Sequence, residues 1–319
     1  MRFSVELIQD ARERISPYIV KTPLLRLYNL DSFLGCQVYA KAECMQITGA
    51  FKLRGAMNKA LSLTKEELAR GIVAASSGNH GKGVAYAAKL LGAKATVVMP
   101  RTAPRVKIEA ISALGAQVVF CDTAERFDLA EKICAETRGV MIPPFNDELI
   151  MAGQGTIGLE LAEQCPDLDK VVVPVAGGGL ISGVSTAVKA CMPGTKVYGA
   201  EPAVRARYSA SLAAGKPISV DIRYTVADAL ASTIPGEKCF PVVVANTDGF
   251  VPVDDEFLLK GMKLLLVEGK VLAEPSSCIG IGAILQGRLE VKADEKVCFI
   301  LSGGSVGLEQ LDVLKNVAL

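Results

Sequence analysis

The sequence predicts an α/β protein built from two doubly wound units, each with an open twisted sheet. From residue 71 onward, short β-branched runs alternate with helix-length segments, which is typical of parallel strands joined by right-handed crossovers. Several of these runs end in glycine-rich turns, and ligands bind at the carboxyl ends of strands in open sheets. With 319 residues, 50% of them apolar, the chain can fill two modest cores. We therefore expect a ligand site between the two units.

An amphipathic helix is expected first, because Leu7, Ile8, Ala11 and Ile15 recur at helical spacing before Pro17. A strand at 37–42 follows, then a helix that ends near residue 63. The next α/β series has predicted strands at 72–75, 95–99, 117–121 and 139–142, and predicted helices at 79–91, 104–114 and 124–137.

A proline-rich break at 143–146 marks the return of the chain to the first unit. We predict that residues 63–147 form one domain, inserted between 1–62 and 148–319. The second series has predicted helices at 150–165 and 180–191 and predicted strands at 171–175, 196–200 and 297–301, with a loop at 213–221 and a helix at the C-terminus.

Composition excludes several classes of partner. There are 35 Lys and Arg against 34 Asp and Glu, a net charge of +1, so we expect neither nucleic acid nor a membrane surface as a partner. No run approaches the roughly 18 apolar residues of a membrane span, and charges near the N-terminus argue against a signal peptide. The nine cysteines form no CxxC pair, which indicates reduced thiols. A cytoplasmic location is expected.

The chain has a single histidine, His80, which argues against a metal centre ligated by several histidines. Any Ser-His-Asp triad would depend on this one residue. Lys52 is the stronger candidate for catalysis, because it lies between Phe51 and Leu53 at the start of a helix-like run. A poorly solvated amine has a lowered pKa and becomes a nucleophile of the Schiff-base kind. The alternative is an ordinary lysine with its amine in water.

Three glycine-rich segments follow apolar runs, at 76–81, 176–180 and 301–305. Gly177, Gly178 and Gly179 open a helix, where backbone N–H groups and the helix dipole form a phosphate cradle. The segment is not a Walker A loop, and Ser182 breaks a GxGxxG pattern. Each segment could instead have a purely structural role. Residues 177–179 could form a tight turn, Asn79 could cap the helix after a β–α turn, and Ser302 could be an ordinary turn residue.

Together with 152–156 and 274–276, these segments resemble, in the same order over nearly the whole chain, the serine/threonine dehydratase and serine racemase group of fold-type II pyridoxal-phosphate enzymes. This resemblance implies a tryptophan-synthase-β-like fold with pyridoxal 5'-phosphate between a large cofactor-binding domain (1–62 and 148–319) and a small mobile domain (63–147). It also implies a homodimer that acts in amino-acid metabolism.

The resemblance assigns roles to residues of this chain. Lys52 would hold the cofactor and remove the α-proton, Phe51 would pack on the pyridine ring, and Ser302 would bond the pyridine nitrogen. Asn79 would bond the 3-oxygen of the cofactor. The other implied cofactor contacts are Gly177, Gly178, Gly179, Leu180 and Glu274.

In that group, the loop that matches residues 76–80 binds the substrate carboxylate. The implied substrate contacts are Ser76, Ser77, Gly78, Asn79 and His80. Ser77 stands where racemases of the group keep an acid/base on the second face of the substrate, so Lys52 and Ser77 are the predicted catalytic residues.

The clearest departure from the resemblance lies at a metal site. Relatives place an aspartate six residues after the glutamate that matches Glu201 and hold Mg²⁺ or Ca²⁺ there, but this chain has Arg207. A guanidinium offers no oxygen ligand, so we expect a metal-free site in which Arg207 pairs with Glu201. The alternative is a solvated surface arginine. Smaller departures near the implied cofactor are Ala50, Ala176, Ala229, Cys278, Ser305 and Gly307.

The sequence therefore predicts a pyridoxal-phosphate-dependent ammonia-lyase that converts a β-hydroxy amino acid, with serine or threonine favoured, to a 2-oxo acid and ammonia. Three alternatives stay open: a serine racemase, a dehydratase of 3-hydroxyaspartate, and a silent cofactor-binding protein. The acidic substrate would need an additional cation, for which Arg54, Arg205 and Arg207 are the candidates. An NAD-binding oxidoreductase is disfavoured because no GxGxxG motif with a downstream acid occurs.

Overall fold

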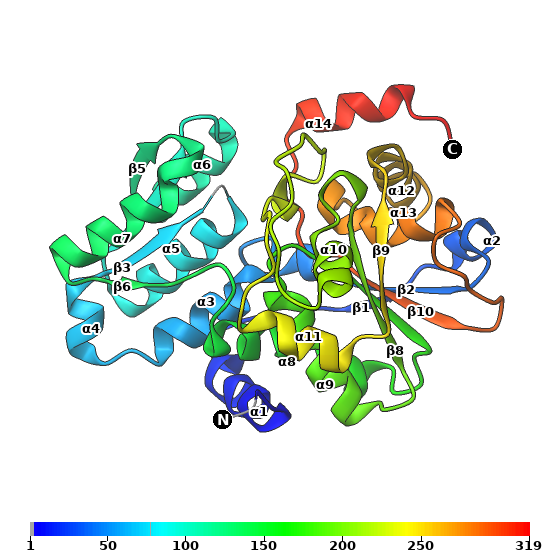
Figure 1. Ribbon diagram of the computed structural model, residues 1–319, viewed down its shortest axis with the longest axis horizontal. Helices are drawn as coiled ribbons and strands as arrows, with labels where there is room; N and C mark the ends of the chain where they lie inside the picture. The colour runs from blue at the N-terminus through cyan, green and yellow to red at the C-terminus, as the bar shows by residue number, and fades with distance from the viewer. Residues whose placement is uncertain (1–2, 77) are drawn as a thin grey trace.

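The computed structural model describes residues 3–76 and 78–319 and contains two separate sheets flanked by helices (Figure 1), so the predicted α/β class is confirmed. The larger sheet is parallel except for its first strand, which pairs antiparallel with its neighbour. Its strands, in spatial order, are β1 (Leu24–Arg26), β2 (Gln37–Lys41), β10 (Lys296–Ile300), β7 (Lys170–Pro174), β8 (Lys196–Pro202) and β9 (Gly249–Val253).

The smaller sheet is wholly parallel. Its strands, in spatial order, are β5 (Gln117–Cys121), β4 (Ala95–Pro100), β3 (Ile72–Ala75) and β6 (Val140–Met141). The helices that precede or connect these strands are α4 (Lys65–Arg70), α5 (Asn79–Leu91), α6 (Arg105–Ser112) and α7 (Arg126–Thr137). All four strands lie within the segment 63–147, whose exact boundaries as a domain stay a prediction.

The other helices are α1 (Val5–Ile15), α2 (Asp31–Leu34), α3 (Lys52–Leu61), α8 (Glu148–Gln164), α9 (Gly179–Cys191), α10 (Arg207–Ala214), α11 (Cys239–Asn246), α12 (Asp255–Val267), α13 (Ile279–Leu285) and α14 (Leu308–Asp312). The loop expected at 213–221 begins after α10, where Gly215 has φ +68°. Strand β9 was not predicted, because it contains Pro252. A proline is tolerated there because β9 is an edge strand.

Helix α3 joins the two sheet units, because it packs against α5 on one side and α8 on the other (Figure 1). The crossing with α8 is close: a Cβ on Gly153 would lie 2.6 Å from the Cα of Gly55. The N-terminus of α3, and with it Lys52, is thereby held between the units. In the parts of the chain that the structure describes, no helix is both long and apolar enough to span a membrane.

Candidate active site

Lys52 is the first residue of α3, and its side chain is only partly exposed. Its Nζ donates a hydrogen bond to the carbonyl oxygen of Pro144 at 2.7 Å and lies 5.0 Å from the centroid of the Phe51 ring. Burial lowers the pKa of the Lys52 amine to about 8. A substantial neutral fraction therefore exists near pH 8, as a nucleophilic or basic lysine requires.

Backbone hydrogen bonds tie the Lys52 segment to the Ser302 segment, although the two are far apart in sequence. The Phe51 N–H donates to the Ser302 carbonyl at 3.0 Å, and the Gly304 N–H donates to the Gly49 carbonyl at 2.9 Å. Two motifs that were predicted to share one site are thus brought together at the end of β10.

The Ser302 hydroxyl is buried, and its Oγ lies 3.0 Å from the Oγ of Ser277. Ser277 also donates to the Gly303 carbonyl at 2.8 Å and accepts from the Gly303 N–H at 2.8 Å. This pair of serines fixes the loop after β10. The contribution of Ser277 was missed, because nothing in the local pattern separates it from a turn serine.

The side chain of Asn79 is held by two groups of the larger sheet unit. Its Nδ2 lies 2.9 and 3.1 Å from the two carboxylate oxygens of Glu274, and its Oδ1 accepts from the Ser305 hydroxyl at 2.6 Å. Glu274 is fully buried, and burial, together with the charge of Asp228, raises the pKa of Glu274 to about 7. Glu274 therefore orients Asn79, and Ser305, which departs from the family pattern, supports it.

At the start of α5, Asn79 is the first helical residue and Gly78 is the N-cap, and Ser76 supplies the side-chain acceptor. The Ser76 Oγ accepts hydrogen bonds from the Gly78 N–H at 3.1 Å and the Gly81 N–H at 2.8 Å. This satisfies N–H groups that a helix start otherwise leaves free. The predicted catalytic residue Ser77 lies outside the described residues.

His80 is buried, with its Nε2 2.8 Å from the Ile142 carbonyl. Burial, together with the nearby charge of Lys52, lowers the pKa of His80 to about 3, so the ring is neutral. Its side chain therefore serves packing between α5 and the end of β6, and a substrate contact from its backbone stays a prediction.

The glycine loop, residues 177–179, follows β7 and opens α9, as predicted. Gly178 has φ +102°, and a Cβ there would lie 1.8 Å from the hydroxyl of Tyr208, so only glycine fits. Leu180 is buried in the first turn of α9. The N-terminal N–H groups of α9 and the helix dipole suit the loop to a phosphate.

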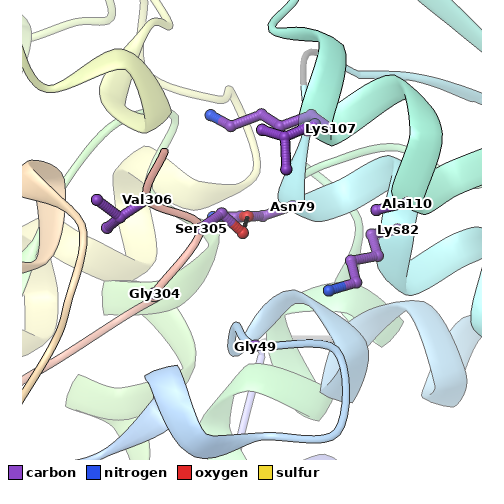
Figure 2. A pocket seen from close by; sticks show the side chains of 10 residues that line it. Gly49, Asn79, Lys82, Lys107, Ala110, Gly304, Ser305 and Val306 are labelled. Atoms are coloured by element: carbon purple, nitrogen blue, oxygen red, sulfur yellow. Dashed lines mark hydrogen bonds between the residues drawn. The ribbon is translucent and has the colours of Figure 1, made fainter. Parts of the chain in front are cut away.

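A cavity of about 160 Å³ lies beside Asn79. It is lined by α5 and α6 on one side and by the loops at Gly49 and 304–306 on the other (Figure 2). Lys107 lines it and donates to the Asp228 carboxylate at 2.6 Å. The amine of Lys82 points into the cavity, and within residues 3–76 and 78–319 it has no hydrogen-bond or ion-pair partner. Sequence reasoning missed both lysines, since a cavity lysine and a solvated one look alike in a helical pattern.

The three arginines considered for an acidic substrate all have other partners. Arg54 is buried between the carboxylates of Glu43 and Glu160. Arg205 donates from Nε to the Arg223 carbonyl at 2.6 Å. Arg207 is buried as well and bonds backbone carbonyls.

Glu201 and Arg207 have separate partners. The Glu201 carboxylate accepts from the N–H groups of Tyr208 and Ser209, each at 2.8 Å, and from the Ser209 hydroxyl at 2.7 Å. The surface position considered for Arg207 is wrong, and the ion pair expected between Glu201 and Arg207 is absent from the described part of the chain. The Glu201 oxygens are committed to helix N–H groups and a guanidinium lies nearby, so this donor set does not fit a divalent cation.

We predict that EDTA leaves the melting temperature of the purified protein unchanged, because the described residues around Glu201 offer no set of oxygen ligands. Arg207→Asp should acquire a rise in melting temperature on addition of Mg²⁺ or Ca²⁺, since it restores a second carboxylate. Thermal scans with and without each ion provide the measurement. A drop in the wild-type melting temperature in EDTA, reversed by Mg²⁺, would contradict this prediction.

Comparison with known proteins shows which family the chain belongs to. Residues 15–303 match the model of the family described as "Pyridoxal-phosphate dependent enzyme". The chain is 41% identical to an L-threonine ammonia-lyase of Thermotoga maritima over 99% of this chain and 79% of that protein. It is 38% identical to an L-threo-3-hydroxyaspartate ammonia-lyase of Saccharomyces cerevisiae over 96% of this chain and 94% of that protein.

The solved structure of maize serine racemase superposes with a TM-score of 0.93 at 37% identity, covering 98% of this chain and 97% of that one. The predicted family, fold and cofactor are therefore confirmed. The amine, the phosphate-suited glycine loop and the buried serine also fit pyridoxal 5'-phosphate, which carries an aldehyde, a phosphate and a ring nitrogen. This chain belongs to the family of pyridoxal-phosphate dependent enzymes.

Proposed function

We propose that the protein is an ammonia-lyase that converts L-serine or L-threonine to the 2-oxo acid and ammonia. The observation that carries this proposal is Lys52, whose amine has a pKa lowered to about 8 and whose segment is tied to Ser302. The similarity to the threonine ammonia-lyase of Thermotoga maritima supports it.

The bound cofactor supplies an electron sink for the negative charge that develops at the α-carbon of the substrate. Lys52 would hold the cofactor through Nζ, and the same amine would accept the α-proton of the substrate. The glycine loop would bind the phosphate, and N–H groups of the 76–80 loop would bind the substrate carboxylate. Ser302 would bond the ring nitrogen through a hydroxyl, and a hydroxyl would leave that nitrogen largely unprotonated and so favour loss of the β-hydroxyl.

A racemase is the first alternative, and the similarity to maize serine racemase supports it. This reaction needs a second acid/base opposite Lys52, the role proposed for Ser77. Formation of the other enantiomer separates the two activities.

An ammonia-lyase for 3-hydroxyaspartate is the second alternative, because the amine of Lys82 points into the cavity beside Asn79 and has no partner among the described residues. A second substrate carboxylate could pair with it. The similarity to the L-threo-3-hydroxyaspartate ammonia-lyase of yeast agrees with this possibility.

The test is a panel of L- and D-serine, L- and D-threonine and 3-hydroxyaspartate, assayed for ammonia, 2-oxo acid and inverted enantiomer. We expect L-serine or L-threonine to have the highest kcat/KM, with ammonia and oxo acid formed in equal amounts. Preference for 3-hydroxyaspartate, abolished in Lys82→Met, would favour the acidic substrate instead. Inverted enantiomer without ammonia would establish a racemase and contradict the proposal.

The lowered pKa of Lys52 predicts a pH dependence for cofactor attachment. Only the neutral amine reacts with an aldehyde, so the rate at which cofactor-depleted protein binds pyridoxal 5'-phosphate covalently should rise with pH, with a midpoint at about 8. Stopped-flow absorbance from pH 6 to 10 gives the profile. A midpoint near 10, as for a solvated lysine, would show that burial does not perturb this amine.

We also propose that the protein is a homodimer and that residues 63–147 form the small mobile domain, as the family resemblance implies. Sedimentation velocity of the holoenzyme tests the first point. Limited proteolysis with and without substrate tests the second, because a domain that closes on substrate becomes protected.

A further inference from the structure

We propose that Arg207 and Tyr208, the first two residues of α10, are positioning residues that hold the glycine loop in its phosphate-binding shape. Neither residue belongs to the predicted cofactor contacts, and Arg207 was considered only as a cation for an acidic substrate. The inference depends on the cofactor, which the family establishes, and not on which amino acid the enzyme converts.

Arg207 is fully buried and clamps two segments of backbone. Its guanidinium donates to the carbonyl oxygen of Val175 at 2.9 Å and to that of Leu230 at 3.1 Å. Val175 lies between the end of β7 and the glycine loop. A charged donor makes a stronger hydrogen bond to a carbonyl than a neutral one, so the approach to the loop is firmly fixed.

Tyr208 acts two residues further along the same loop. Its hydroxyl donates to the Gly177 carbonyl at 3.2 Å, and its ring stacks on Phe250 with centroids 4.9 Å apart. The same hydroxyl occupies the space that a Cβ on Gly178 would need. The Tyr208 side chain thus forms one wall of the loop.

These two contacts, together with the hydrogen bond at 2.8 Å from the Gly236 N–H to the Gly177 carbonyl, determine where the loop's donors point. None of the described peptide bonds is cis. In a planar trans peptide bond, the carbonyl and the N–H of the next residue point in opposite directions. Holding the Gly177 carbonyl at Tyr208 therefore turns the Gly178 N–H away from α10. Holding the Val175 carbonyl at Arg207 does the same for the Ala176 N–H. N–H groups directed away from α10 are available to an anion on the other side of the loop.

The start of α10 is itself anchored. Glu201, in β8 next to β7, accepts hydrogen bonds from the Tyr208 and Ser209 N–H groups, and it thereby caps the helix with a carboxylate. The burial of Arg207 also has a cost, since desolvation lowers the pKa of its guanidinium to about 10. A buried cation bonded to carbonyls alone is an unfavourable choice for stability, which agrees with a functional role at the loop.

The experiment compares two ligands that differ only in the phosphate. Dissociation constants for pyridoxal 5'-phosphate and for pyridoxal are measured on cofactor-depleted full-length protein by absorbance titration. The variants are Arg207→Met, Arg207→Lys and Tyr208→Phe. The matched controls are Arg205→Lys and Tyr198→Phe, because Arg205 donates to the Arg223 carbonyl and the Tyr198 ring lies beside Gly249.

Arg207→Met is expected to weaken pyridoxal 5'-phosphate binding by about tenfold or more, and Tyr208→Phe by about fivefold, with pyridoxal binding unchanged. Arg207→Lys should retain part of the affinity. Equal losses of affinity for both ligands would show that Arg207 and Tyr208 contribute only to general stability, which would contradict the proposal. Unchanged pyridoxal 5'-phosphate binding in Tyr208→Phe would also contradict it. If Arg207→Met does not fold, Tyr208→Phe and Arg207→Lys decide the outcome by the same comparison.

Discussion

Lys52→Ala is expected to lower turnover by about a thousandfold or more, because it removes both the attachment point of the cofactor and the predicted base. The fold should survive, since Lys52 is partly exposed and its side chain makes one hydrogen bond, to Pro144. Steady-state kinetics with L-serine and L-threonine, together with circular dichroism, measure both effects.

Lys59→Ala is the matched control, because Lys59 lies on the same helix as Lys52. Its amine forms an ion pair with the Asp147 carboxylate at 2.8 Å. It should keep nearly full activity. If Lys52→Ala retained turnover comparable to Lys59→Ala, Lys52 would have no catalytic role.

Arg54→Met is expected to be the most destabilising single substitution, by about 3–5 kcal/mol. Arg54 donates from three nitrogens to Glu43 and Glu160, and all three side chains are almost completely buried. Without the guanidinium, two carboxylates stay buried with Lys41 as their remaining cation, at 2.5 Å from Glu160. The melting temperature should fall by about 10 °C.

Arg105→Met provides the comparison, because Arg105 pairs with Glu109 on an exposed helix surface and such pairs contribute about 1 kcal/mol or less. Urea unfolding of both variants gives the free energies. A midpoint for Arg54→Met equal to that of Arg105→Met would show that the buried ion network is not what anchors the start of α3.

Local sequence patterns predicted much of the smaller sheet, because its strands and helices are short, regular and separated by glycine turns. The structure places β3, α5 and β5 at the predicted bounds. The elements between 202 and 296 were largely missed, since their ends carry weak turn signals and β9 contains a proline. Strand β1, with three residues, is too short to leave a pattern.

The candidate site, like the fold, could be predicted only in part from the sequence. Lys52, Ser302 and the glycine loop could be found from the sequence, because each follows an apolar run and has a residue type suited to the cofactor. The link between Asn79 and Glu274 could not, as it joins side chains 195 positions apart.

Arg207 shows where such reasoning fails. Its departure from the family pattern was visible, but its expected pairing with Glu201 was wrong. Whether a guanidinium meets a carboxylate or two carbonyls depends on how β7, β8 and α10 pack, and local sequence does not encode that arrangement.

The attachment of the cofactor is the central claim, and borohydride reduction of the holoenzyme followed by peptide mapping tests it most directly. Reduction converts the linkage between the lysine and the cofactor into a stable secondary amine, which marks the residue. We predict a single pyridoxyl label, on Lys52. A label on any other lysine, such as Lys82 in the neighbouring cavity, would contradict the assignment of this active site.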